Sequence, residues 1–123
     1  MKRKDLTALT EIAVMIRDRE MAELAKLNLQ RLRLETERQR VVQETKSAWR
    51  DGTESVMLSR AAENFAKWAT SKQSQISEHL ANLRPLIDAQ KQRTAAATGR
   101  HRNLQEIARQ LLEEHRKAED KKT

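Results

Sequence analysis

The stretch Trp49-Arg50-Asp51-Gly52-Thr53-Glu54 decides the fold, because its Asp51-Gly52 pair is the only strong turn signal in the chain. Thr53 belongs to the residue types that cap helix N-termini, so a new helix can begin directly after it. The stretch therefore predicts two helices, one on each side of a tight turn at about residues 50–53.

The sequence before the turn repeats with a period of seven residues, as in a coiled-coil helix. The repeating positions are Leu6, Ala13, Glu20, Leu27, Leu34, Val41 and Ala48. This pattern predicts a first helix over about residues 5–49.

The sequence after the turn carries a second column with the same period, in which Gln90 is the only polar member. The column consists of Ala62, Ala69, Ile76, Leu83, Gln90, Ala97, Leu104, Leu111 and Ala118. Its many alanines would allow a facing helix to approach closely. The pattern predicts a second helix over about residues 54–119.

Together the two columns predict an all-α fold, a long antiparallel two-helix coiled-coil hairpin that forms a single domain over residues 1–123. The seam is expected to contain Leu6, Ala13, Leu27, Leu34, Val41, Ala62, Ala69, Ile76, Leu83, Ala97, Leu104 and Leu111. Pro85 removes one backbone hydrogen bond from the second helix, so we expect a kink near residues 82–84. Gly99 is a softer weak point, and three helices in place of two remain an alternative.

The composition excludes several classes of protein. Aromatic residues make up only 2% of the 123 residues, which argues against a thick globular core, and the absence of Cys excludes disulfides and thiolate metal sites. No stretch approaches the roughly 18 apolar residues of a membrane span, and no signal peptide is recognisable, so we expect a cytoplasmic protein. The net charge of +7 arises from 25 basic residues interleaved with 18 acidic ones, as on a solvated helix surface.

The residues also predict no enzyme and no cofactor. The only imidazoles, His79, His101 and His115, are too widely spaced along a helix to share a metal ion. No Gly-rich loop could hold a triphosphate, and the adjacent acids Glu113 and Glu114 lie on an open helix without a pocket.

Two clusters are candidates for binding partners. All aromatic rings belong to Trp49, Phe65 and Trp68; Phe65 fits the seam, whereas Trp68 is displaced from it and resembles an interface anchor. The alternative for Trp68 is packing against the Trp49 end of the first helix. The densest basic stretch contains Arg84, Lys91, Arg93, Arg100 and Arg102, which indicates either a solvated face or a nucleic-acid contact.

A two-helix pair with so few large side chains gains little from burial compared with the cost of ordering its backbone. We therefore expect a partner, self-association or a larger assembly to complete the hairpin.

Two segments carry a resemblance to a known family. Leu6-Thr7-Ala8-Leu9 and residues 16–25 resemble the opening helix of the bacterial flagellar FliJ family, which has YscO-like relatives in type III secretion. Residues 101–117, with leucines embedded among Arg and Glu, are similar to the last helix of that family.

The resemblance implies a cytoplasmic component of the flagellar or type III protein export apparatus, peripheral to its membrane-embedded part. Members of that family form a two-helix stalk that binds and stimulates a hexameric export ATPase and reaches toward the export gate protein. On this reading the gate or export chaperones would contact Trp49, Phe65 and Trp68. The ATPase would face the basic termini, which are Lys2, Arg3, Lys4, Arg116, Lys117, Lys121 and Lys122.

Two other functions remain open. The chain could be a scaffold that self-associates through its Ala-rich seam into a four-helix bundle, in contrast to a stalk that is monomeric alone or only weakly self-associating. It could also be a helical nucleic-acid binder, with affinity that falls steeply with salt.

Overall fold

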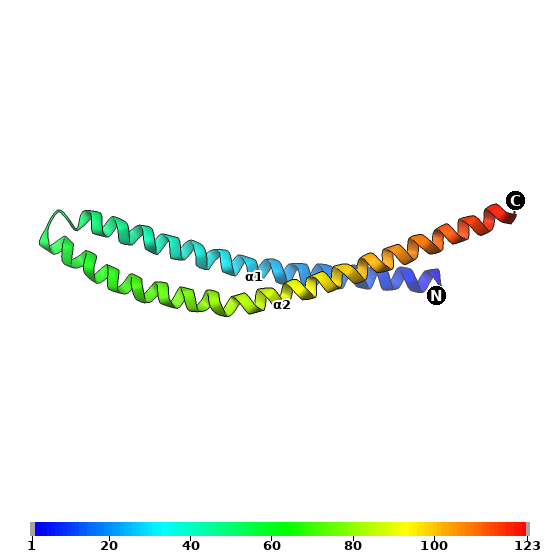
Figure 1. Cartoon of the computed structure of the whole chain (residues 1–123), viewed down its shortest axis with the longest axis horizontal. Helices are drawn as coiled ribbons and strands as arrows, with labels where there is room; N and C mark the ends of the chain where they lie inside the picture. Colours follow the sequence, from blue (N-terminus) through cyan, green and yellow to red (C-terminus); the bar gives the residue numbers. More distant parts are fainter. Residues whose placement is uncertain (1, 123) are drawn as a thin grey trace. The chain divides into compact units, whose positions relative to one another are not determined.

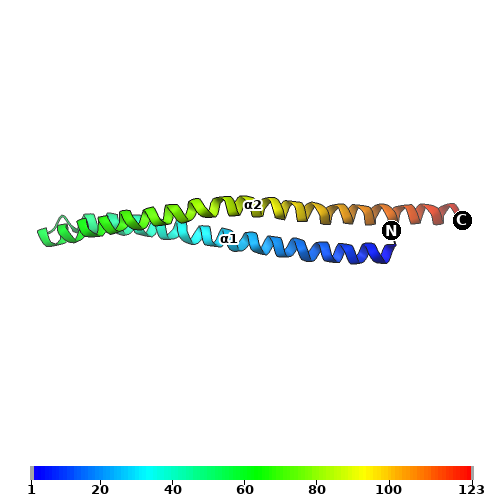
Figure 2. The same cartoon turned by 90° about the horizontal axis from the view of Figure 1, so that it is seen from below.

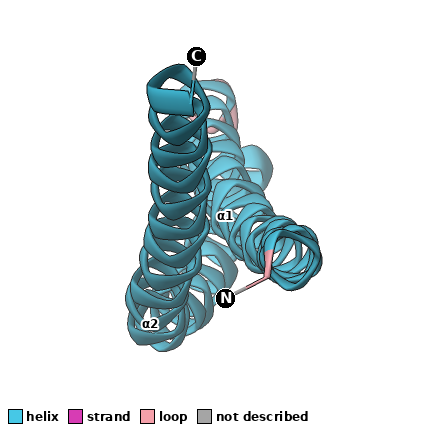
Figure 3. Ribbon diagram, turned by 90° about the vertical axis from the view of Figure 1, so that its right-hand side faces the viewer, coloured by secondary structure: helices cyan, strands magenta, loops and turns pink. Residues whose placement is uncertain are grey.

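The computed structural model describes residues 2–122; Met1 and Thr123, which the predicted domain includes, lie outside the described residues. Helix α1 spans Arg3–Asp51 with 49 residues, and helix α2 spans Val56–Lys122 with 67 residues. The two long helices pack against each other, and residues 2–122 contain no strand (Figures 1 and 3). The predicted all-α helical hairpin is therefore confirmed.

The turn lies at residues 52–55, two residues later than expected. The N–H of Gly52 donates to the carbonyl oxygen of Ala48 at 2.8 Å, and the hydroxyl of Thr53 donates to the carbonyl oxygen of Arg50 at 2.9 Å. Thr53 therefore satisfies the end of α1, where carbonyl groups lack helical partners. The expectation that Thr53 caps α2 is wrong.

Ser55 caps the start of α2 instead. Its hydroxyl oxygen accepts a hydrogen bond from the N–H of Leu58 at 3.1 Å, and its carbonyl accepts one from the N–H of Ser59 at 2.9 Å. The first bond is that of an N-cap residue, which pairs a free N–H of the opening turn.

Helix α2 continues through Pro85 without a break, so residues 2–122 form two helices and not three. Proline removes the N–H that would pair with the carbonyl of Ala81. Both Pro85 and Ala81 are exposed to solvent, so water can satisfy this carbonyl at low cost.

Contacts divide the chain into two compact units. One, here the turn unit, is Lys26–Ile87, and the other, the terminal unit, is Met1–Ala25 with Asp88–Thr123. Each contains one segment of α1 and one of α2. In the turn unit the two segments lie side by side, from cyan to green in Figures 1 and 2.

The turn unit is held together by apolar residues. Its buried side chains are those of Val41, Ala62, Ala69, Ile76 and Ile87. One ion pair also joins the two helices, because Nζ of Lys72 lies 3.1 Å from Oε1 of Glu37.

The terminal unit has a different interior. Its buried apolar residues are Leu6, Ala13 and Ala97, and Gln90 and His101 are buried with them. Polar side chains therefore occupy part of its seam.

The other expected seam residues are less covered. Leu27, Leu34, Leu83 and Leu104 are half-buried. Leu111 is 39% exposed, because α1 begins at Arg3 and offers only three residues before Leu6 to cover it.

Candidate partner-binding surfaces

The three histidines do not form a reactive group. His79 is exposed, His101 is buried and accepts a hydrogen bond from Arg17, and Nε2 of His115 lies 3.1 Å from Oε1 of Glu119. Within residues 2–122 no three His, Asp or Glu side chains gather as a metal site would require. Neither α1 nor α2, as far as they are described, has an apolar stretch long enough to cross a membrane.

The aromatic residues are partly brought together. The rings of Phe65 and Trp68 lie 5.3 Å apart between centroids and are tilted by 45°. Phe65 is half-buried at the seam, whereas Trp68 is 51% exposed, as expected for a side chain displaced from the seam. Trp49 is also exposed, and among the described residues the ring contact joins Phe65 and Trp68 alone. The tilted pair holds the Trp68 ring at the surface in a defined orientation.

A further apolar surface follows the turn directly. Val56, Met57 and Leu58, the first residues of α2, are all exposed. Sequence reasoning missed this surface, because the heptad column of the second helix begins only at Ala62. The signal available was three consecutive large apolar residues beside a turn, where polar residues are the rule.

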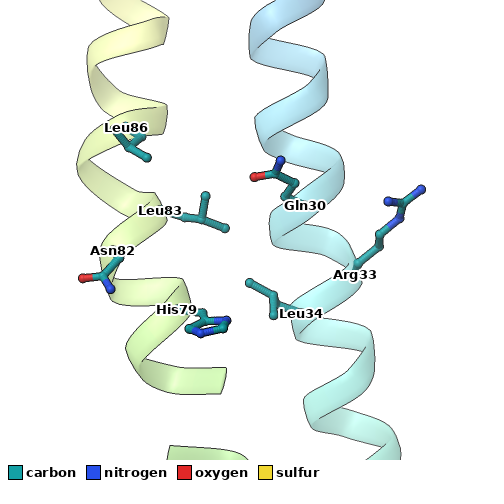
Figure 4. A pocket seen from close by; sticks show the side chains of 7 residues that line it. All are labelled: Gln30, Arg33, Leu34, His79, Asn82, Leu83 and Leu86. Carbon is teal, nitrogen blue, oxygen red and sulfur yellow. The ribbon is translucent and has the colours of Figure 1, made fainter. Parts of the chain in front are cut away.

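The turn unit also carries a shallow hollow between its helices, with a volume of about 420 Å³. Figure 4 shows Leu34 of α1 and Leu83 of α2 pointing toward each other, with Leu86 farther along α2. His79 and Gln30 lie beside them. The hollow is therefore mainly apolar, with polar groups at its border.

A larger hollow of about 920 Å³ lies in the terminal unit, between the start of α1 and the last turns of α2. Its apolar lining consists of Leu6, Val14, Ala108, Leu111 and Leu112. Charged or titratable side chains also line it, namely Arg3, Glu11, Arg109 and His115. Sequence reasoning missed this hollow, because it depends on where α1 begins opposite α2.

The basic termini all belong to the terminal unit and are exposed. They are Lys2, Arg3, Lys4, Arg116, Lys117, Lys121 and Lys122. Arg3 and His115 line the same hollow, so the start of α1 and the end of α2 lie near each other. The two sets of basic residues are thus found at the same end of this unit.

One charged cluster on α2 is joined by several hydrogen bonds. Arg109 donates from Nη2 to Oε1 of Glu106 at 2.7 Å and from Nη1 to Oε2 of Glu113 at 3.0 Å. The hydrogen bond from Arg109 lowers the pKa of the Glu106 carboxyl, and the same bond raises the pKa of Arg109. All three side chains are solvent-accessible, so solvent weakens these interactions.

The basic stretch does not form one stripe in the terminal unit. Lys91 and Arg102 are 11 residues apart and share one face of α2, whereas Arg93 and Arg100 share another, about 180° away at 3.6 residues per turn. The fifth member, Arg84, is an exposed residue of the turn unit. This division favours a solvated helix over a groove that follows a phosphate backbone.

No protein-family model matches the chain, and neither a curated protein nor a solved structure matches it at a significant level.

Proposed function

We propose that this chain is a non-catalytic stalk of the flagellar or type III protein export apparatus. It would act in the cytoplasm, bind and stimulate the hexameric export ATPase, and reach the membrane export gate. The family assignment rests on the resemblance of residues 6–9, 16–25 and 101–117.

The main observation in support of the proposal is a contrast between the two kinds of apolar residue. Small side chains form most of the buried seam, whereas many large apolar side chains are exposed. The seam is built largely from Ala, Val and Ile, while Leu9, Ile12, Ile16 and Leu112 remain exposed on the same two helices. A pair of long helices that leaves so much apolar surface uncovered is suited to bind other proteins along its length.

The terminal unit is the proposed ATPase-binding end. Exposed cations from both ends of the chain lie there beside an apolar hollow. Such a surface suits a partner with acidic and apolar residues, because basic residues speed association and apolar contacts hold the complex. Trp68, with Phe65 beside it, and Trp49 are the proposed contacts for the gate protein or for export chaperones.

The test is co-purification with the export ATPase of the same cell, followed by ATPase rates with and without the chain. We expect binding and a faster rate for the natural chain. Reversal of Lys2, Arg3, Lys4, Arg116 and Lys117 to Glu should abolish both.

A matched control keeps the change in net charge equal. Reversal of five exposed cations of the turn unit, namely Lys26, Lys46, Arg50, Arg60 and Lys67, should leave ATPase binding intact. Equal loss of binding in both variants would show a general charge effect and contradict the assigned surface. Failure of the natural chain to bind would contradict the stalk itself.

The second candidate is a self-associating scaffold. It is favoured by Leu9, Ile12 and Ile16, whose spacing of three and four residues gives α1 an exposed apolar face. Light scattering separates the two functions, because a stalk should have the mass of one 14.3 kDa chain, whereas a scaffold should be a dimer or larger.

A further inference from the structure

We infer that α1 and α2 separate locally in the terminal unit while they stay paired in the turn unit. The terminal unit is called the polar clasp below, because polar side chains hold its two helix segments together. The inference is independent of the proposed function, because it rests on what each unit buries.

The two units differ in the chemistry of their interiors. Gln90 is 7% exposed and His101 is 6% exposed, and they are the buried polar side chains of the described chain; both belong to the terminal unit. Among the described residues of that unit, Leu6 is the only large apolar side chain that is buried, whereas the turn unit buries Val41, Ile76 and Ile87.

The first polar contact between the helices centres on Glu20. Nε2 of Gln90 donates to the main-chain carbonyl of Glu20 at 3.0 Å and also to its carboxylate. The hydroxyl of Thr94 lies 3.2 Å from the same carbonyl and 2.8 Å from that of Gln90, and it donates to one of them at a time.

The second polar contact joins Arg17 and His101. Nη1 of Arg17 donates to Nδ1 of His101 at 3.2 Å, which requires the ring to carry its proton on Nε2. Arg17 also contacts Asp18, with Nη2 3.0 Å from Oδ1. The guanidinium group is thus shared between a surface carboxylate and a buried ring.

These polar contacts favour one alignment of the helices but hold it weakly. On separation each donor and acceptor exchanges its protein partner for water, so little net free energy is lost. An apolar side chain has no such replacement, because its exposure to water is unfavourable. A shift in register would leave Gln90 and His101 buried without partners, so the clasp closes in one alignment.

The large apolar residues of the terminal unit do not offset the weakness of these polar contacts. On α1, Leu9, Ile12 and Ile16 are exposed outside the seam, and Ile107 and Leu112 are exposed on α2. Separation of the helices would therefore add Leu6 and Ala13 to an apolar surface that is already accessible. The open clasp would expose one continuous apolar face of α1 to solvent.

The test is amide hydrogen exchange of the full chain, read by mass spectrometry. We compare peptides around residues 13–20 and 90–101 with peptides around residues 38–45 and 69–80, all more than one turn from the helix ends. Opening of the clasp predicts protection in the first pair lower by on the order of tenfold or more. Equal protection in both pairs would overturn the inference, because the hairpin would then open as one cooperative unit.

A double variant tests whether the two buried polar groups cause the lower protection of the terminal unit. Gln90→Leu combined with His101→Leu replaces both buried polar groups and should raise protection of residues 13–20 by on the order of tenfold, with residues 38–45 unchanged. Gln73→Leu, at a half-buried position of the turn unit, is the control and should leave residues 13–20 unchanged. A loss of protection in the double variant would contradict the clasp, and the comparison within the natural chain stands even if the variant does not fold.

Discussion

Gly52 lies so close to Ala62 that a Cβ atom on residue 52 would be 3.1 Å from the Cβ of Ala62. The same atom would lie 3.1 Å from the carbonyl oxygen of Ala48. Gly52 does not have a positive φ, so glycine is required here for space and not for an unusual backbone conformation. The turn thus places residue 52 directly against Ala62 of α2, with no side chain on residue 52 between them.

Gly52→Ala should lower the free energy of unfolding by about 1–3 kcal/mol, because the added methyl group must displace backbone or Ala62. Gly99→Ala is the matched control, since nothing lies within 4 Å of a Cβ atom at that position. Within helix α2 this substitution should stabilise the chain by about 0.5–1 kcal/mol. Urea denaturation followed by circular dichroism measures both, and equal effects of the two substitutions would contradict the steric argument.

Ile76→Ala should lower the free energy of unfolding by about 2–5 kcal/mol, because the side chain is only 2% exposed and its removal leaves a cavity. Met57→Ala removes a side chain that is 81% exposed and should change stability by less than about 0.5 kcal/mol. Thermal unfolding of both variants provides the comparison. A large effect of Met57→Ala would show that the start of α2 packs against something that the isolated chain supplies.

The Lys72–Glu37 ion pair should contribute about 0.2–1 kcal/mol, because both side chains are partly exposed to solvent. A double-mutant cycle with Lys72→Met and Glu37→Gln measures the coupling between them. The coupling should decrease as salt rises from low concentration to about 1 M, since salt screens exposed charges. Coupling that does not change with salt would indicate a contact other than charge.

Glu106 provides a pH-dependent prediction. The hydrogen bond from Arg109 lowers the pKa of the Glu106 carboxyl from 4.5, so the pair stabilises the helix above pH 4.5 and is lost as pH falls through the lowered pKa. NMR titration of the carboxyl should show this lowered pKa. Arg109→Gln should return it toward 4.5, and an unchanged titration in that variant would exclude Arg109 as the cause.

Trp68→Ala should leave thermal unfolding nearly unchanged, because half of its side chain is exposed, but it should weaken binding to the export gate protein or to export chaperones. The measurement is a pull-down with each purified partner. Met15→Ala, which removes another exposed apolar side chain, should bind as the natural chain does. Undiminished binding by Trp68→Ala would remove this residue from the proposed interface.

The sequence was sufficient for the helices because its heptad columns and its Asp51-Gly52 turn agree with each other. It was less reliable where two residues compete for one role. Thr53 and Ser55 can both act as caps, and only the position of the last α1 carbonyls decides between them. Pro85 predicts a weak point, yet solvent at Ala81 allows the helix to continue.

Contacts between the helices were harder to predict. Gln90 was recognised as a polar member of a column, but its partner Glu20 is 70 residues away. The Arg17–His101 hydrogen bond depends on how the two helices are aligned along each other. The seven-residue repeat alone does not determine this alignment. The exposure of Leu111 has the same origin, because it follows from where α1 begins.

The turn at Gly52 also sets an order for folding. Contacts beside it, such as that of Gly52 with Ala62, close a very short loop, whereas the Glu20–Gln90 contact closes a loop of 70 residues. Since the entropy cost of closing a loop rises with its length, pairing begins at the turn and proceeds toward the chain ends. During synthesis α1 would leave the ribosome without a partner, and the emerging turn would give it the first turns of α2 to pair with.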